Sequence, residues 1–230
     1  AKIEAGRSCD IRRCISCNKG CTDAIQERRF ISCVLNAENG CENMRSITPA
    51  DVKKKVAVIG GGPAGLEAAR VASLRGHSVT LFERETELGG QLNLACLPPR
   101  KNEMRRATQD LIHAVRCAGV HLCLGCTVTE QQLLDAKFDA VIVAVGAHNA
   151  APAIPGKENI NVADAWSVLA SAEQVYGKVA VIGGGLVGSE TAELLAEQGC
   201  HVSVIEMMDK IAAAESTTIL PTLMESFKAH

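Results

Sequence analysis

The sequence predicts an α/β protein in which two copies of one β-α-β unit follow a short cysteine-rich segment. The copies form a repeat: "KVAVIGGGPAGLEAARVASLRGHSVTLFE" (55–83) aligns without gaps with "KVAVIGGGLVGSETAELLAEQGCHVSVIE" (178–206), and 14 of the 29 positions are identical. Each copy carries the spacing G-x-G-x-x-G, and a group of four closely spaced cysteines precedes the first copy. The constant offset of 123 residues is far longer than a solenoid period of about 20–50 residues. It therefore indicates a duplicated folding unit.

The composition narrows the class of protein. The chain has 230 residues, of which 47% are hydrophobic, so it can bury a real core in one or two domains. A net charge of −2 and an aromatic content of 3% argue against a nucleic-acid partner or an anionic membrane surface. No run reaches 18 apolar residues, and "AKIEAGRSCD" lacks the apolar core of a signal peptide. We therefore expect a cytoplasmic protein with no membrane contact, whose 11 cysteines are thiols or metal ligands.

The sequence of the first copy predicts a strand, a helix and a second strand. A strand is expected at Val56–Ile59 and a helix at Pro63–Arg75, where Pro63 suits the first helical turn because its missing N–H costs nothing there. Gly76 ends that helix. A second strand is expected at Val79–Glu83.

The rest of the chain alternates in the same way. A basic helix is expected near Lys101–Ala118, and the two prolines of "AAPAIPG" (150–156) predict a linker. The final "TTILPTLMESFKAH" resembles a helix. Further elements are expected at Val120–Leu124 and Ala140–Val145 (strands), Ala163–Ala172 (helix) and Val179–Ile182 (strand).

Both glycine loops have the chemistry of a pyrophosphate site. In this pattern the first glycine makes the tight turn, the second lets the backbone approach the phosphates, and the third lets helix and strand pack closely. The helix N-terminus then offers N–H groups and a partial positive charge. A glycine-rich turn without any ligand is the alternative. The glycines concerned are Gly60, Gly62 and Gly65 in the first copy and Gly183, Gly185 and Gly188 in the second.

Each copy also ends its second strand on an acid. Glu83 and Glu206 stand 23 residues after their first glycines, where a carboxylate accepts hydrogen bonds from ribose hydroxyls and repels a 2′-phosphate. No arginine follows Glu206 in "EMMDKI", although Lys210 does. The second loop is therefore expected to prefer NADH to NADPH. Two dinucleotide sites in one chain suggest a flavin and a nicotinamide, because a flavin can release a hydride's two electrons singly.

The cysteine group has the spacing C-x2-C-x3-C-x11-C, formed by Cys14, Cys17, Cys21 and Cys33. Three thiolates on one tight loop, with a fourth beyond a helix, suit an iron–sulfur centre. Structural zinc is the alternative, although zinc sites more often use two C-x2-C pairs.

We assign no catalytic, redox or metal-binding role to the remaining cysteines or to the histidines. Cys123 and Cys126 form a C-x2-C that suits a redox pair, but they fall at a strand end and are interpreted as plain thiols. The other cysteines are interpreted as small buried or surface residues, and no histidine falls in a ligand or triad pattern. These residues are Cys9, Cys41, Cys96, Cys117 and Cys200, and the histidines considered are His77, His113 and His201.

With "ERETELGGQLNLA" (83–95) and "FDAVIVAVGAHNAAPAIPG" (138–156), these motifs resemble the C-terminal half of a known family. That family is the iron–sulfur flavoenzymes related to 2,4-dienoyl-CoA reductase, with enoate reductases, trimethylamine dehydrogenase and other NADH:flavin oxidoreductases of the Old Yellow Enzyme group. The resemblance implies two Rossmann-like, glutathione-reductase-like units, with FAD on the first loop and NAD(P)H on the second. It also implies a [4Fe–4S] cluster on Cys14, Cys17, Cys21 and Cys33, since the family's ligands share this spacing.

The resemblance further implies individual contacts. Glu83 meets the FAD ribose, Arg84 lies near the adenosine, and Val128 meets the adenine through its backbone. Val145 stands where the family usually has threonine, a mild departure because backbone groups make that contact. The expected cofactor residues are Gly60, Gly62, Pro63, Ala64, Gly65, Glu83, Arg84, Gly90, Gln91, Val128, Ala144, Val145 and Gly146 for FAD, and Gly183, Gly185, Leu186, Val187, Gly188 and Glu206 for NADH.

The predicted organisation is a cluster segment at 1–50, an incomplete FAD domain at 51–155 and a truncated NAD(P)H domain at 156–230. The predicted function is an electron-transfer module that passes electrons from NADH through FAD and the cluster to FMN. The FMN would lie in a barrel, in the same polypeptide or a partner subunit, that reduces an enoyl-type substrate. A homo-oligomer covering open sheet edges is a further expectation. The alternatives are an inactive FAD or ADP-ligand binding module and a flavoprotein like the glutamate synthase small subunit.

Overall fold

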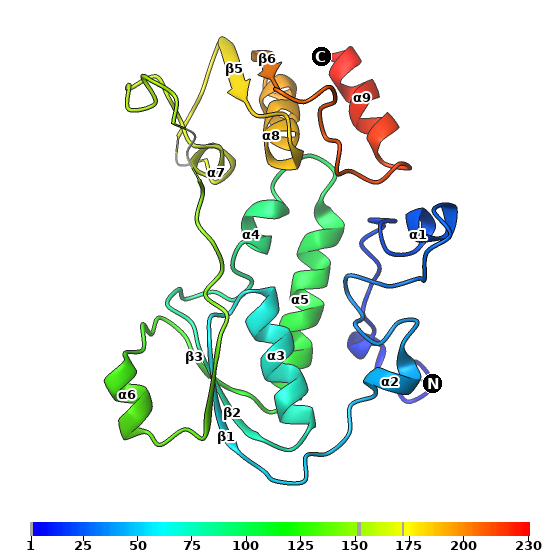
Figure 1. Ribbon diagram of the computed structural model, residues 1–230, viewed down its shortest axis with the longest axis vertical. Coiled ribbons are helices and arrows are strands. Elements are labelled where there is room, and N and C mark those ends of the chain that lie inside the picture. Colours follow the sequence, from blue (N-terminus) through cyan, green and yellow to red (C-terminus); the bar gives the residue numbers. More distant parts are fainter. Residues whose placement is uncertain (1, 151–152, 172) are drawn as a thin grey trace. The chain divides into compact units, whose positions relative to one another are not determined.

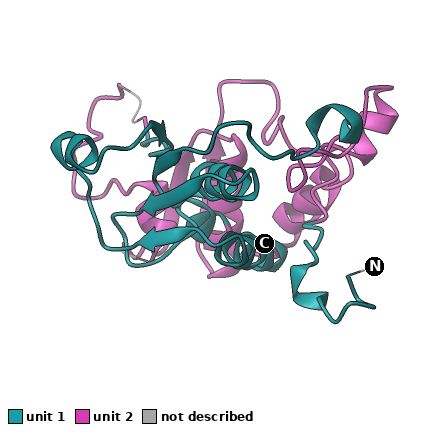
Figure 2. Cartoon of the chain, turned by 90° about the horizontal axis from the view of Figure 1, so that it is seen from below, with its two compact units in different colours: residues 1–15, 41–95, 102–149 teal, residues 16–40, 96–101, 150–230 magenta. Residues whose placement is uncertain are grey.

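The computed structural model describes residues 2–150, 153–171 and 173–230 (Figure 1). The chain divides into two compact units, each assembled from separate stretches of sequence. Unit 1 contains residues 1–15, 41–95 and 102–149, and unit 2 contains residues 16–40, 96–101 and 150–230 (Figure 2). Each unit holds one copy of the repeat, so each can be described by itself.

Unit 1 is built on a parallel sheet of four strands in the order β3-β2-β1-β4. The first copy of the repeat supplies the two central strands, β1 (Lys55–Ile59) and β2 (Ser78–Phe82), which pair from Lys55↔Ser78 to Ile59↔Phe82. β3 (His121–Cys123) extends the sheet beside β2, and β4 (Ala140–Val143) lies beside β1. The carboxyl ends of β1, β2 and β4 therefore meet at one edge, where ligands of open α/β sheets bind.

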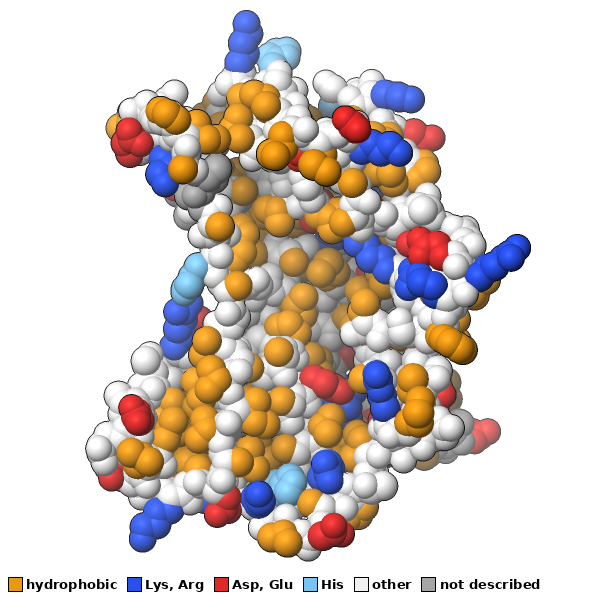
Figure 3. Space-filling model, viewed as in Figure 1, with side chains coloured by type: hydrophobic (Ala, Val, Ile, Leu, Met, Phe, Trp, Pro, Cys, Tyr) orange, Lys and Arg blue, Asp and Glu red, His pale blue; other side chains and the backbone are white. Residues whose placement is uncertain are grey.

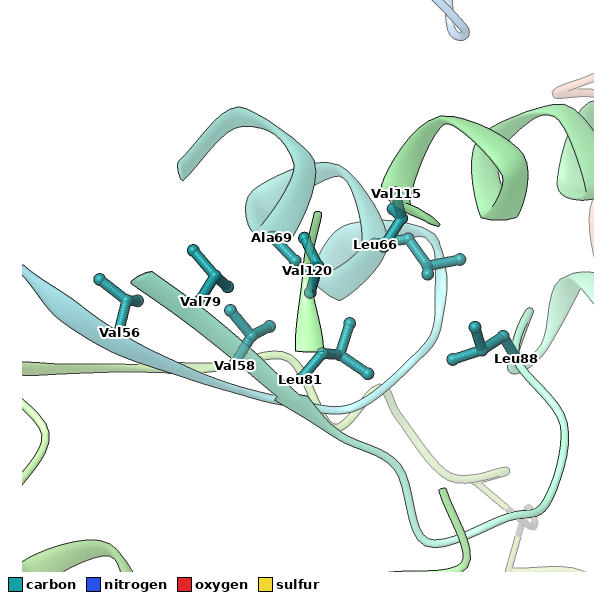
Figure 4. Close-up of a cluster of buried hydrophobic side chains, with 9 residues drawn as sticks. All are labelled: Val56, Val58, Leu66, Ala69, Val79, Leu81, Leu88, Val115 and Val120. Carbon is teal, nitrogen blue, oxygen red and sulfur yellow. The ribbon is translucent and has the colours of Figure 1, made fainter. Parts of the chain in front are cut away.

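Two helices supply the hydrophobic core of unit 1. α3 (Pro63–Leu74) connects β1 to β2, and α5 (Asn102–Cys117) packs against it. Figure 4 shows apolar side chains from both helices meeting those of the strands; Val58, Leu66, Leu81 and Val115 are fully buried. The shorter helices of this unit are η1 (Ser8–Asp10), α2 (Glu42–Arg45), α4 (Leu92–Ala95) and α6 (Glu130–Asp135).

Apolar side chains also remain exposed on unit 1. Val143 of the edge strand β4 is 70% exposed, and its neighbours Val141 and Ile142 are partly exposed. Figure 3 shows hydrophobic side chains gathered on the lower part of the face in view, where Figure 1 places the strands of unit 1. β4 is thus an edge strand whose apolar side chains remain exposed in the described sheet.

Unit 2 contains the second copy as a parallel pair of strands, β5 (Lys178–Ile182) and β6 (His201–Ile205), joined by α8 (Leu186–Glu197). Its core includes Leu195 on α8 and Leu223 on α9 (Leu220–Ala229). Arg100 pairs with Glu193 and Glu197, and Lys101 pairs with Glu190, so residues 96–101 are fastened to α8. The other helices of the unit are α1 (Thr22–Gln26) and α7 (Ala165–Leu169).

The predicted strands and the three long predicted helices are confirmed to within a few residues. The helix expected at Ala163–Ala172 is shorter: Asp164 caps its start, and Ser171, with φ of 57°, has left the helical conformation. Residue 172 and residues 151–152 of the expected linker lie outside the described residues. Among the residues that the structure describes, no helix is both long and apolar enough to span a bilayer.

Candidate functional site

The first glycine loop joins β1 to α3, and close backbone contacts select its glycines. Gly60 has φ of +108°, and a Cβ there would lie 2.3 Å from the carbonyl oxygen of Ala144. A Cβ on Gly65 would lie 1.9 Å from the carbonyl oxygen of Gly60. Both neighbours are backbone atoms that cannot move aside, so these two positions require glycine.

Gly62 is different, because it faces open space. It has an ordinary extended backbone, and the nearest atom to a Cβ there would be the Cα of Gly90, at 4.0 Å. Gly62 is also the N-cap of α3, and its position carries no side-chain cap for the helix N–H groups. Pro63 and Ala64 of the first turn are exposed. This combination fits a phosphate group, which would occupy the space that a Cβ fills and accept from the helix N–H groups.

Glu83 binds this loop from the end of β2. Its buried carboxylate accepts a hydrogen bond from the backbone N–H of Gly61 through Oε2 (2.5 Å) and from that of Glu85 through Oε1 (2.9 Å). Each carboxylate oxygen can accept more than one hydrogen bond. The acid is therefore fixed beside the glycine loop and keeps acceptor capacity for a ribose hydroxyl.

The second loop reproduces this arrangement bond by bond. Gly183 has φ of +99°, and a Cβ on Gly188 would lie 1.8 Å from the carbonyl oxygen of Gly183. Gly185 caps α8 without a side chain and has no atom within 4 Å of a Cβ position. Glu206 accepts from the backbone N–H of Gly184 (2.7 Å) and of Met208 (2.9 Å).

Two further backbone bonds extend the correspondence at the offset of 123 residues. The N–H of each first glycine donates to the end of the second strand: Gly60 to Phe82 and Gly183 to Ile205, both at 2.8 Å. The carbonyl of the middle glycine accepts from the segment that follows: Gly61 from Gly89 and Gly184 from Ala212. The repeat found in the sequence is thus a repeat of hydrogen bonds.

The electrostatics of the second acid follow from these bonds. The N–H groups of Met208 and Gly184 stabilise the ionised carboxylate and hold the pKa of Glu206 below its ordinary value. Glu206 is therefore charged at neutral pH.

Other expected FAD residues gather around the first loop. Gly90, with φ of +52°, lies so close to Gly62 that a Cβ would stand 2.9 Å from its Cα. Gln91 donates through Nε2 to the carbonyl of Ala147 (2.8 Å), just past the turn at Gly146. The loop, the segment after Leu88 and the end of β4 thus meet at the carboxyl edge of the sheet.

The remaining residues expected to bind cofactors are mostly exposed or half-buried. The side chain of Arg84 is exposed and pairs with Glu85 at 3.1 Å, and Val145 is 69% exposed. Val128 is half-buried in the segment after β3. In unit 2, Leu186 and Val187 form the first turn of α8, and Val187 is exposed.

Cys123 and Cys126 lie beside the first acid. Cys123 ends β3 and its carbonyl accepts from the N–H of Glu83, while the N–H of Cys126 donates back to Glu83. Burial, with a smaller contribution from Cys126, raises the pKa of the Cys123 thiol. A raised pKa keeps the thiol protonated and unreactive, which supports their interpretation as plain thiols.

The cysteine loop contains backbone contacts that draw its ends together. The N–H of Ser32 donates to the carbonyl of Gly20 at 2.6 Å, which joins the two segments that carry Cys21 and Cys33. In the described residues no three of the four expected cluster cysteines have Sγ atoms that all lie within 4.8 Å of one another. The helix expected between Cys21 and Cys33 is α1. Cys21 and Cys33 are exposed and Cys17 is partly exposed; Cys14, also exposed, belongs to the stretch assigned to unit 1.

Sequence reasoning missed the group of residues that anchors this loop. Asp23 of α1 is buried and accepts hydrogen bonds from the hydroxyls of Ser216 (3.0 Å) and Thr217 (2.9 Å). The side chain of Asn18 donates to Thr218, and Lys19 pairs with Glu215. These partners are almost 200 residues apart, and no spacing or motif links them.

Comparison with known proteins shows which family this chain belongs to. Residues 54–230 match the family described as "Pyridine nucleotide-disulphide oxidoreductase". The chain is 60% identical over 229 residues to a bilirubin reductase of Mediterraneibacter gnavus, with all of this chain and 36% of that protein covered. It is 43% identical over 218 residues to an NADH oxidase of Thermoanaerobacter brockii, covering 92% of this chain and 33% of that protein.

A solved structure of 2-naphthoyl-CoA reductase superposes with a TM-score of 0.93 at 30% identity, covering 99% of this chain and 35% of that one. The chain thus spans about a third of the length of these relatives. The chain belongs to the pyridine nucleotide-disulphide oxidoreductase family and is homologous to the FAD- and NAD-binding region of iron–sulfur flavoenzymes of the Old Yellow Enzyme group.

Proposed function

We propose that this chain is the electron-transfer module of an NADH-dependent iron–sulfur flavoenzyme. The first glycine loop holds FAD, the second holds NADH, and the four cysteines hold a [4Fe–4S] cluster. When bound, these groups would supply hydride transfer from NADH to FAD and single-electron transfer through the cluster toward FMN. The observation that carries the proposal is the duplicated loop: one chain with two complete G-x-G-x-x-G turns, each bonded to its own acid.

The contribution of the chain itself is binding and orientation. The open positions at Gly62 and Gly185 admit pyrophosphate to the N-termini of α3 and α8, while the fixed carboxylates of Glu83 and Glu206 accept from ribose. Gly90 approaches Gly62, and the side chain of Gln91 bonds to the carbonyl of Ala147, so further groups lie around the first site. This supports FAD, the larger ligand, on the first loop.

The choice of NADH over NADPH follows from Glu206. Its carboxylate is ionised at neutral pH, and the N–H groups of Met208 and Gly184 hold its pKa further below its ordinary value. An ionised acid at the end of β6 repels the 2′-phosphate of NADPH. The expected outcome is tighter binding of NADH than of NADPH.

The cluster assignment rests on the spacing of the cysteines, on the contact between Gly20 and Ser32, and on the homology. Three of the thiols lie on one loop around α1, and Asp23 anchors that loop to residues 216–217. Thiolate-only donor sets suit iron–sulfur clusters. The cysteine segment is proposed as residues 1–50, the FAD domain as 51–155 and the NADH domain as 156–230.

The final acceptor is proposed to lie outside this stretch of sequence. The relatives are about three times as long as this chain, since it covers 36%, 33% and 35% of them. Their names include reductases of bilirubin, cinnamate and 2-naphthoyl-CoA. We therefore assign FMN to a barrel of the same polypeptide or of a partner subunit, where an enoyl-type substrate is reduced.

The cluster and flavin assignments are tested together by composition. We would purify the chain anaerobically, reconstitute it with FAD, iron and sulfide, and measure bound flavin, iron, sulfide and zinc. The expected result is about one FAD with about four iron and four sulfide per chain. Cys33→Ser should lose most of the iron and keep the FAD, whereas the matched control Cys41→Ser should keep both. Zinc without iron would overturn the cluster, and failure to take up FAD would overturn the flavin site.

A further inference from the structure

Four side chains with no part in the proposed function gather where η1 meets α5 in unit 1. Asp10 Oδ1 lies 3.1 Å from Nε2 of His113 and 3.8 Å from Sγ of Cys9. The Sγ of Cys117 lies 3.4 Å from the same Nε2. Among the described residues, Cys9, Asp10 and His113 are the one set of three such donors whose ligand atoms all lie within 4.8 Å of one another.

Local structure explains why these donors converge. His113 and Cys117 are separated by four positions on α5, so both project from the same face of the helix. Cys9 and Asp10 are adjacent in η1, which packs on α5. One turn away, Arg13 holds Asp110 through its backbone N–H (3.0 Å), its Nε (3.0 Å) and its Nη2 (2.5 Å). This separate ion pair fastens the N-terminal segment to the helix and so preorganises the donor group.

The distances between donors match those around one small metal ion. Zinc binds sulfur at about 2.3 Å and nitrogen or oxygen at about 2.0–2.2 Å in a tetrahedron, so its ligands stand about 3.3–3.8 Å from one another. Three distances, 3.1, 3.8 and 3.4 Å, lie close to this range. Cys117 contacts His113 but does not lie within 4.8 Å of all three other donors, so its thiol must move toward Cys9 and Asp10 to complete the shell. Two thiols, one imidazole and one carboxylate are also the donor types that zinc takes, whereas calcium and magnesium take oxygen donors.

The contacts of Asp10 also suit a ligand role. Arg7 pairs with Oδ2 of this carboxylate at 3.5 Å. Oδ1 is the oxygen that faces His113 and Cys9.

We propose that Cys9, Asp10 and His113, with Cys117 as the fourth ligand, form a zinc site separate from the four cysteines of the proposed cluster. Binding releases the thiol protons, and Nε2 of His113 coordinates the ion in place of its hydrogen bond to Asp10. With four protein ligands the site is closed, so its role is structural. It clamps the segment that leads into Cys14 onto α5. The inference uses contacts within unit 1 alone and is independent of the proposed function.

The experiment must separate this site from the cluster cysteines. The background is the full chain with Cys14, Cys17, Cys21 and Cys33 all changed to serine, prepared anaerobically with a phosphine reductant. Zinc is titrated in competition with a chromogenic chelator. One equivalent should bind. His113→Ala, Cys9→Ser and Cys117→Ser should each lower the affinity by more than about tenfold, since even changes outside the ligand shell cost about 10- to 100-fold.

Matched controls keep the result specific. His121→Ala and Cys41→Ser remove the same chemical groups elsewhere in unit 1 and should leave the affinity unchanged. Urea midpoints of the metal-free variants, compared with the background chain, show that each variant is folded. Cobalt offers a second readout, because a site with two thiolates gives sulfur-to-cobalt charge-transfer absorption that Cys9→Ser and Cys117→Ser should each reduce.

Two results would overturn the proposal. One is a background chain that binds no zinc. The other is zinc binding that His113→Ala and Cys9→Ser leave as strong as the two controls do. If those two variants weaken binding but Cys117→Ser does not, the assignment of Cys117 as the fourth ligand is wrong.

Discussion

At the scale of single residues, Gly62 and Gly185 offer the sharpest separation of ligand binding from folding. Both have φ values that alanine adopts, −75° and −65°, and space for a Cβ. Gly62→Ala and Gly185→Ala should therefore leave the urea midpoint unchanged or slightly higher. The new methyl group fills the space for the phosphates, so Gly62→Ala should weaken FAD binding and Gly185→Ala NADH binding. Losing one or more charged hydrogen bonds costs about 1.5–3 kcal/mol, or about 10- to 100-fold in affinity.

The matched variants are Gly65→Ala and Gly188→Ala. Their Cβ atoms would collide with the carbonyl oxygens of Gly60 and Gly183 at 1.9 and 1.8 Å, so they should lower both stability and binding. Isothermal titration with each ligand, beside urea unfolding, measures both effects. If Gly62→Ala weakened NADH and spared FAD, the order of the two sites would be wrong.

Glu206 should make stability depend on pH. Its pKa is lower in the folded chain than its ordinary value, so the folded state favours the ionised form. The stabilisation is fully present above the unfolded pKa, about 4.3, and disappears as the pH falls through the folded pKa. Glu206→Gln should thus lower the urea midpoint at pH 7, and the difference from the parent chain should shrink below about pH 4.

The control for this experiment is Glu87→Gln, a change at an exposed glutamate outside the loop. It should leave the pH profile of the midpoint unchanged. A gap between Glu206→Gln and the parent that stayed constant from neutral pH to the acid limit would contradict the assignment.

Whether a site residue could be predicted from the sequence depended on how far away its partner lies in the sequence. The glycines and acids were predictable because the turn, the helix start and the strand end fall within one unit of about 30 residues. Asp23 and Ser216 were not, because their bond joins positions 193 apart and leaves no local pattern. The donor group around His113 was missed for the same reason: its members lie in two segments more than 100 residues apart.

At the scale of elements, helices and strands with strong local sequence signals were predicted, and those with weak signals were not. β1, α3 and β2 follow from an apolar run, a glycine turn, a proline at the helix start and Gly76 at its end. Four-residue helices such as α2 and α4 lack a full period of apolar residues and were not expected. α6 carried a readable signal that was missed, the capping box of Thr129 and Gln132.

The attachment of α1 to residues 216–217 makes a prediction at this scale. Changing Asp23 to alanine removes the acceptor for two hydroxyls, one of them on Ser216, which is almost fully buried. Each hydroxyl keeps a second partner, Thr218 Oγ1 for Ser216 and Gln26 Oε1 for Thr217. The cost is therefore that of two lost hydrogen bonds, about 1–3 kcal/mol in all. Asp23→Ala should therefore lower the free energy of unfolding by that amount and, after reconstitution, speed the loss of iron to a chelator.

Asp51→Ala, at an exposed aspartate ahead of β1, serves as the comparison and should change neither quantity. An Asp23→Ala chain with the parent's stability and rate of iron loss would mean that these hydrogen bonds do not hold the cysteine loop.

At the scale of the whole molecule, exposed apolar strands predict self-association. In the described sheet of unit 1, β4 is an edge strand, and Val143 on it is 70% exposed. Unpaired edges with apolar side chains recruit further strands. Sedimentation velocity should show association that grows with concentration.

A charge on the edge blocks such pairing. Val143→Lys should accordingly shift the chain toward monomer, while Val52→Lys, at an exposed valine outside the sheet, should not. A parent chain that sediments as a monomer at every concentration would contradict this expectation.

The proposed function rests on the duplicated unit. Two loops with the same hydrogen bonds fit the two dinucleotides, FAD and NADH, that we assign to them. The most direct test is an anaerobic titration of the reconstituted chain with NADH, followed by flavin absorbance. NADH should bleach the flavin in the parent chain and should need a much higher concentration to do so in Gly185→Ala. A flavin that stays oxidised in the parent while saturating NADH is bound would contradict the proposed function.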